Sequence, residues 1–147
     1  MSDLFTGLDP HNINIKYWNV SNVKDMSSMF FICKNFNCDL SNWDVSNVEN
    51  MNSMFYGCKN FTGEGLENWK TIKCIKMDFM FSSCENLNCN LSNWDVSNVE
   101  TMCNMFCGCL NFKGEGLENW KPIKCKDMYY MFDDCPSLKN KPKWYKK

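Results

Sequence analysis

The sequence predicts an α/β repeat fold, a solenoid of five stacked rungs that each contain a short strand, a turn and a short helix. Residues 38–87 and 89–138 are identical at 34 of 50 aligned positions without a gap. Tryptophan recurs at intervals of 25 or 26 residues, which divides each 51-residue block into two rungs. A fixed period of this length is typical of proteins built by stacking similar units. The tryptophans that mark the rungs are Trp18, Trp43, Trp69, Trp94 and Trp120.

The strand and the helix of each rung are predicted from the spacing of the apolar residues. Trp43 and Val45, which are two residues apart, indicate a strand with one buried face. Between residues 23 and 33 the apolar positions are spaced by three, three, one and three, which is typical of the buried stripe of a short helix. Trp94 and Met105 occupy such inward positions in the fourth rung, and we expect both to be fully buried.

Serines and glycines mark where the predicted helices begin and where two rungs lengthen. Ser21, Ser46 and Ser97 stand two residues before the first apolar helical position, where an N-cap side chain accepts a backbone N–H. The second and fourth rungs have 26 residues, and the additional residue lies in glycine-containing loops at residues 61–66 and 112–117. Since glycine tolerates positive φ, we expect a bulge there that keeps the tryptophans in register.

The chain is predicted to form one domain without a linker. Residues 1–17 match half of the rung pattern and are interpreted as an N-terminal capping half-rung. Residues 18–144 are expected to form the five-rung solenoid, and residues 145–147 a basic tail. Pro136 and Pro142 disfavour a further rung, because proline has no backbone N–H to donate.

The repeat motif has a family resemblance. In one-letter code the rungs approximate WDVSNVxxMxxMFxxCxxFNxxLSNW, and the pattern covers residues 18–138. It is similar to the repeats of the BspA-like leucine-rich-repeat surface proteins of Mycoplasma and some giant viruses. The resemblance implies a leucine-rich-repeat-like, right-handed solenoid and a surface or interaction protein. The small residue after Met-Phe is commonly alanine in those repeats, and here it is Cys33, Cys58, Cys84, Cys109 or Cys135.

Composition argues against several classes of function. The net charge is -1, there is one histidine and no arginine, and no nucleotide-binding or metalloprotease motif occurs. We therefore expect that the chain is not an enzyme, that it binds no cofactor and that it does not bind nucleic acid. The longest apolar run, residues 29–33, is too short to span a membrane. The first three residues lack the features of an export signal, so the expected location is a reducing intracellular compartment, in the host or viral cytoplasm, or a virion.

The eleven cysteines are divided into core residues and one exceptional pair. Nine occupy repeated positions and are interpreted as buried free thiols, since free cysteine is among the most buried residue types. Cys103 and Cys107 break the repeat and are expected on the outward face of the predicted helix. Two soft ligands at that spacing could bind a metal, but a closed zinc site needs four ligands. An incidental pair of exposed thiols is the favoured interpretation, with no metal site.

The predicted binding surface lies on the strands beside each tryptophan. Asparagines precede the tryptophans, and residues of alternating charge follow them along the stack. These side chains either stabilise the sheet through cross-strand pairs or bind a protein partner. The eight residues of this predicted polar surface are Asn42, Asp44, Asn68, Lys70, Asn93, Asp95, Asn119 and Lys121.

The sequence alone leaves two functions open. The first is a non-catalytic protein–protein interaction scaffold that binds its partner through the strand face. The alternative is a structural component that associates with copies of itself in a larger particle such as a virion. The sequence does not identify the partner.

Overall fold

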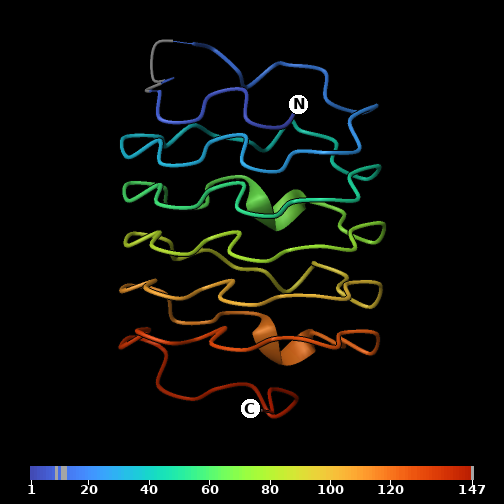
Figure 1. The fold of residues 1–147 in the computed structure, drawn as a ribbon, viewed down its shortest axis with the longest axis vertical. Coiled ribbons are helices and arrows are strands. Elements are labelled where there is room, and N and C mark those ends of the chain that lie inside the picture. The colour runs from blue at the N-terminus through green and yellow to red at the C-terminus, as the bar shows by residue number, and fades with distance from the viewer. Residues whose placement is uncertain (9, 11–12, 147) are drawn as a thin grey trace.

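The computed structural model describes residues 1–8, 10 and 13–146, and in it the chain winds through successive turns that stack one above another (Figure 1). Each turn of the chain, here called a rung, corresponds to one 25- or 26-residue repeat. The termini lie at opposite ends of the stack (Figure 1). Isolated parallel β-bridges join equivalent residues of neighbouring rungs. The bridged residues are Asp25, Asn50, Lys76, Thr101 and Asp127.

The prediction of α/β, leucine-rich-repeat-like rungs is wrong. In the described part of the chain two single turns of 3₁₀ helix have defined bounds, η2 (Leu66–Asn68) and η3 (Leu117–Asn119), and Pro10 is also in 3₁₀ conformation. No α-helix and no extended strand is present among these residues. The rungs instead consist of tandem turns and short irregular segments that exchange backbone hydrogen bonds with their neighbours.

The segments predicted as helices are runs of overlapping β-turns, here called turn segments. Their backbone N–H groups alternate in direction. The N–H of Phe31 donates to the Ser28 carbonyl of its own rung at 3.1 Å, whereas the N–H of Ser28 donates to Asn52 of the next rung at 2.9 Å. An α-helix would instead direct every N–H four residues back. The turn segments are residues 1–8, 26–33, 51–58, 77–84, 102–109 and 128–135.

Positive φ angles explain why these segments do not continue as helices. Each has two residues, four positions apart, in the left-handed region. They include the bulky residues Ile32 (φ 59°) and Phe79 (φ 56°), and also Gly108 (φ 75°). A residue in this region interrupts a right-handed helix, and a non-glycine residue there is strained by roughly 1–2 kcal/mol. The apolar spacing of three, three, one and three is equally compatible with tandem turns that point the same side chains inward.

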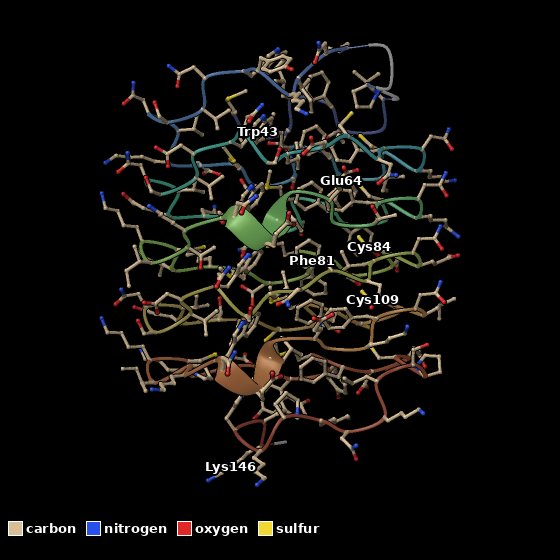
Figure 2. The ribbon with its side chains drawn as sticks, turned by 180° about the vertical axis from the view of Figure 1, so that it is seen from behind. Trp43, Glu64, Phe81, Cys84, Cys109 and Lys146 are labelled. Carbon is tan, nitrogen blue, oxygen red and sulfur yellow. The ribbon has the colours of Figure 1, made fainter. Side chains whose placement is uncertain are left out.

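Stacked aromatic rings fill the interior of the stack, as Figure 2 shows for Trp43 and Phe81. The rings of Phe55, Phe81 and Phe106 follow one another at centroid distances of 5.6 Å, nearly parallel. Trp94 stacks between the tryptophans of the adjacent rungs at 6.1 and 6.2 Å. Its indole N–H donates to the carbonyl of Leu66, 28 residues earlier in the chain, at 2.8 Å. Trp94 and Met105 are buried, as predicted.

The predicted N-cap serines have a different role, because no helix follows them. The backbone N–H of Ser46 donates to the Asp44 carboxylate at 3.0 Å, and that of Ser97 donates to Asp95 at 2.9 Å. Ser21 makes the equivalent bond to the side chain of Asn19 at 3.1 Å. These are Asx turns, in which the residue after tryptophan fixes the bend at the end of the segment.

The additional residue of the longer rungs lies in a tight turn that precedes each 3₁₀ helix. Gly116 precedes η3 with φ 86°. A Cβ atom added there would lie 2.3 Å from the backbone nitrogen of Ser92 in the preceding rung. Glycine is therefore required for two reasons, its backbone conformation and the close approach of two rungs.

We predict that the stability of the stack depends more on a central tryptophan than on a terminal one. Trp94→Ala should lower the free energy of unfolding by about 3–5 kcal/mol, because it removes a buried ring between two others. Trp144→Ala should cost much less, since Trp144 is half-buried and stacks on Trp120 alone among the tryptophans. Urea melts of the two variants measure the difference. Equal losses would contradict the stacked-ring description.

We also predict that two glycines with similar φ differ in their tolerance of alanine. Gly108→Ala should cost about 1–2 kcal/mol, the strain of a non-glycine residue in the left-handed region, because an added Cβ meets only ordinary contacts near Ser83. Gly116→Ala should cost considerably more, because the added Cβ also collides with the backbone of Ser92. Thermal unfolding of both variants compares the two costs. A milder effect at Gly116 would rule out the close approach seen here.

Candidate functional site

The eight residues of the predicted polar surface are all exposed. None of them lies on a strand: Asn68 and Asn119 end the 3₁₀ helices η2 and η3, and the other six lie on irregular segments beside the tryptophans. The Asp44 and Asp95 carboxylates accept hydrogen bonds from Ser46 and Ser97, and these bonds lower the pKa of both carboxyls. The positive charge of Lys70 in the next rung lowers the pKa of Asp44 further. Asp44 and Lys70 are therefore close enough to interact between neighbouring rungs, whereas the pKa of Asp95 is lowered by Ser97 without a contribution from a lysine.

Part of the polar surface is engaged in holding the rungs together. The Asn93 amide donates to the carbonyl of Glu67 in the preceding rung at 3.1 Å. Among the described residues, no hydrogen bond is seen for the side chains of the other three asparagines of the surface or of its two lysines. These uncommitted side chains are Asn42, Asn68, Asn119, Lys70 and Lys121. The polar surface therefore combines a structural role with groups available to a partner.

Other charged side chains are paired between rungs. Lys73 donates to the Asn47 side chain at 2.6 Å, and the equivalent Lys124 donates to Asn98 at 2.6 Å. The Lys59 ammonium forms an ion pair with the Glu85 carboxylate of the next rung, with an N–O distance of 2.6 Å. Exposed ion pairs contribute little to stability individually. Their effect here is to engage these charges within the stack, which makes them weaker candidates for binding a partner.

A partly exposed aromatic row on the turn segments was not predicted from the sequence. Phe31 and Tyr56 stack with their ring centroids 4.8 Å apart, and Tyr56 lies 6.5 Å from Phe79 in the third rung. Phe31 and Tyr56 are half-buried, Phe79 is 39% exposed, and Ile32 beside the row is 40% exposed. We call Phe31, Tyr56 and Phe79 the aromatic row. Contiguous apolar groups at the surface are characteristic of protein interaction sites.

The sequence contains only a weak signal for the aromatic row. Phe31 and Tyr56 occupy equivalent positions in their rungs, but Ser82 occupies that position in the third rung. Phe79 stands three residues before Ser82, at the position that Ser53 holds in the second rung. A position-by-position comparison of the repeats therefore shows no aromatic column, because the row joins two different repeat positions.

The five cysteines that follow Met-Phe in the repeats donate hydrogen bonds between rungs, and Figure 2 shows two of them, Cys84 and Cys109, inside the stack. The Cys84 thiol donates to the carbonyl of Phe55 in the preceding rung at 2.9 Å, and Cys109 makes the equivalent bond to Phe81 at 3.0 Å. Burial raises the pKa of both thiols well above the usual range. A thiol supplies a donor that alanine lacks, which gives a physical reason for cysteine at this position.

The predicted burial of the nine repeated cysteines is confirmed only in part. Cys84 and Cys109 are buried free thiols, as predicted. Four of the nine are half-buried, because they lie nearer the surface or the C-terminal end of the stack. These four are Cys38, Cys89, Cys125 and Cys135.

Cys103 and Cys107 are half-buried residues of a turn segment, so their predicted place on an outward helix face is wrong. Partial burial, with a smaller contribution from Asp127, raises the pKa of Cys103 to about 12. Partial burial and the nearby Asp134 raise the pKa of Cys107. Within the described residues no group of three or more histidine, cysteine, aspartate or glutamate side chains is arranged to hold a metal ion.

The chain belongs to the family described as "Mycoplasma protein of unknown function, DUF285", whose model matches residues 1–65 and 61–146. The two matches agree with the internal repetition of the sequence. No curated protein and no solved structure matches the chain. Among the described residues, no helix has the length and apolar character needed to cross a bilayer.

We predict that the labelling of Cys103 by a thiol reagent depends steeply on pH. Its pKa of about 12 leaves few thiolates at a pH of about 8, and the thiolate fraction rises about tenfold for each pH unit below the pKa. Cys84 should stay unlabelled until the chain is unfolded, because it is fully buried. Peptide mass spectrometry after timed alkylation measures both sites. Rapid labelling of Cys103 at neutral pH would show that its thiol is not perturbed in this way.

Proposed function

We propose that this chain is a non-catalytic protein-interaction module. The observation that supports the proposal best is the aromatic row, which crosses three rungs and is not needed to fill the core. Aromatic side chains dominate the energetics of many protein interfaces. The BspA-like resemblance, with its surface or interaction proteins, is consistent with this role.

The composition of the rungs supports recognition more than catalysis. The inward positions are dominated by stacked aromatic rings, which offer no acid or base to a reaction. The outward positions differ from rung to rung, as Tyr56 and Cys107 illustrate. A surface that varies over a constant core is how repeat proteins acquire extended binding faces. The polar surface is the second candidate face, since its lysines Lys70 and Lys121 are uncommitted.

A structural role in a larger particle such as a virion is the alternative function. Free thiols such as Cys84 and Cys109 favour a reducing compartment as the location of either function, because disulfides form and persist mainly in oxidising environments. The structural role requires contacts between copies of the chain. The interaction module requires only contacts with a different protein.

We predict that the aromatic row contributes most of the binding free energy for a protein partner. Tyr56→Ser with Phe79→Ser introduces the residues found at the equivalent positions Ser82 and Ser53, so the fold should be retained. The double variant should lose at least about 2 kcal/mol of binding free energy, the usual threshold of a hot spot. The partner is first captured from the native source and identified, and its affinity is then measured by calorimetry.

The control for this experiment changes the polar surface in the same manner. Lys70→Asp with Lys121→Asp introduces the residue that Asp44 and Asp95 hold at equivalent positions. This variant should bind nearly as well as the unmodified chain. Loss of binding in the control alone would place the site on the polar surface. Full binding by both variants would exclude both faces.

A further inference from the structure

Backbone hydrogen bonds between turn segments all run in one direction along the stack. In each segment the alternate N–H groups donate to carbonyls of the following rung, as Phe81 does to Met105 at 2.9 Å. In the last turn segment the equivalent groups include the N–H of Tyr130, Phe132 and Asp134. No hydrogen bond from these three N–H groups is seen within the described part of the chain. The C-terminal end of the stack therefore presents a row of donors.

The N-terminal end presents the complementary row of acceptors. In the first turn segment the N–H groups of Phe5 and its alternate neighbours already donate to the second segment. The carbonyls on the other side belong to Ser2, Leu4 and Thr6, and no donor to them is seen among the described residues. Leu4 is 45% exposed and Leu8 is 59% exposed. The equivalent residues of the next turn segment, Met29 and Cys33, are fully buried because another rung covers them.

The two rows match in spacing and in register. Both contain groups on alternate residues, and the ladder inside the stack pairs each N–H with a carbonyl one repeat position earlier in the following rung. If this ladder continued into a second copy, the N–H of Tyr130 would pair with the carbonyl of Ser2. The N–H groups of Phe132 and Asp134 would pair with the carbonyls of Leu4 and Thr6. A groove lined by Met128, Tyr129 and Trp144 also lies at the C-terminal end.

Tyr145 covers part of the C-terminal end in the structure. It follows Trp144, and the residues that follow the other rung tryptophans are all exposed, whereas Tyr145 is half-buried. Its ring packs edge-on against Phe132 at 5.0 Å. Phe106 and Phe132 stack with their ring centroids 5.7 Å apart. If the stack of phenylalanines continued into a further rung, its next ring would cover the side of Phe132 that Tyr145 now covers. Its buried hydroxyl has no hydrogen-bond partner among the described residues, which makes this placement an imperfect cap.

We propose that the two ends of the stack bind each other head to tail in a second copy of this chain, and that Tyr145 opposes this contact by covering Phe132. The interface is heterologous, because the donor end of one copy meets the acceptor end of the next. A contact of this type leaves one free end of each kind, so it generates open chains of copies. The surface involved is distinct from both the aromatic row and the polar surface.

The experiment compares the mass of variants of the 147-residue chain by sedimentation velocity over a range of concentrations. Tyr145→Ala uncovers the end and should raise the weight-average mass at least to that of a dimer. Tyr145→Phe removes the unpaired hydroxyl but keeps the ring, so it should remain monomeric like the unmodified chain. Circular dichroism confirms that each variant is folded.

A second pair of variants tests which surface carries the association. Leu4→Lys and Leu8→Lys, added to Tyr145→Ala, place charges at the acceptor end and should restore the monomer. Ile72→Lys, added to Tyr145→Ala, changes a residue that is 41% exposed away from the ends and should leave association intact. A folded Tyr145→Ala variant that stays monomeric overturns the proposal. Association that survives the two charges at Leu4 and Leu8, or equal association of the unmodified chain, also overturns it.

Discussion

The structure depends on the alternating direction of backbone N–H groups in the turn segments. One set of N–H groups closes β-turns within a rung, and the other set joins that rung to the next. A rung alone cannot satisfy both sets, because half of its donors require the neighbouring carbonyls. Stability is therefore shared between adjacent rungs, as in other stacked repeats. The strained residues Ile32 and Phe79 are tolerated because this network fixes the backbone on both sides.

The sequence was sufficient to predict the repeat and its inward residues, but not the local backbone. The period of tryptophan sets the length of a rung, and the buried Trp94 and Met105 follow from it. The helix prediction failed because tandem β-turns produce the same apolar spacing as a short helix. What separates the two is positive φ at residues such as Ile32, and a β-branched side chain gives no warning of that conformation.

The candidate surfaces show the same division between what a pattern reveals and what it does not. The exposure of Asp44 and Lys70 follows from their alternation with buried neighbours. The aromatic row combines two different repeat positions, so Phe79 joins Tyr56 only once the rungs are stacked. Cys103 shows the reverse error, since its departure from the repeat suggested an exposed site and the thiol is half-buried with a raised pKa.

The stack separates the residues that determine the fold from those that are free to vary. Inward positions are constrained twice, because a ring such as Phe81 must fit the rungs on both sides, and a change there disturbs two interfaces. Outward positions of the turn segments contact fewer neighbours, so Tyr56, Cys107 and Asp133 occupy one repeat position with very different chemistry. Selection for binding can therefore act on these positions with little loss of stability. Recognition on the outer surface follows from the same stacking that closes the interior.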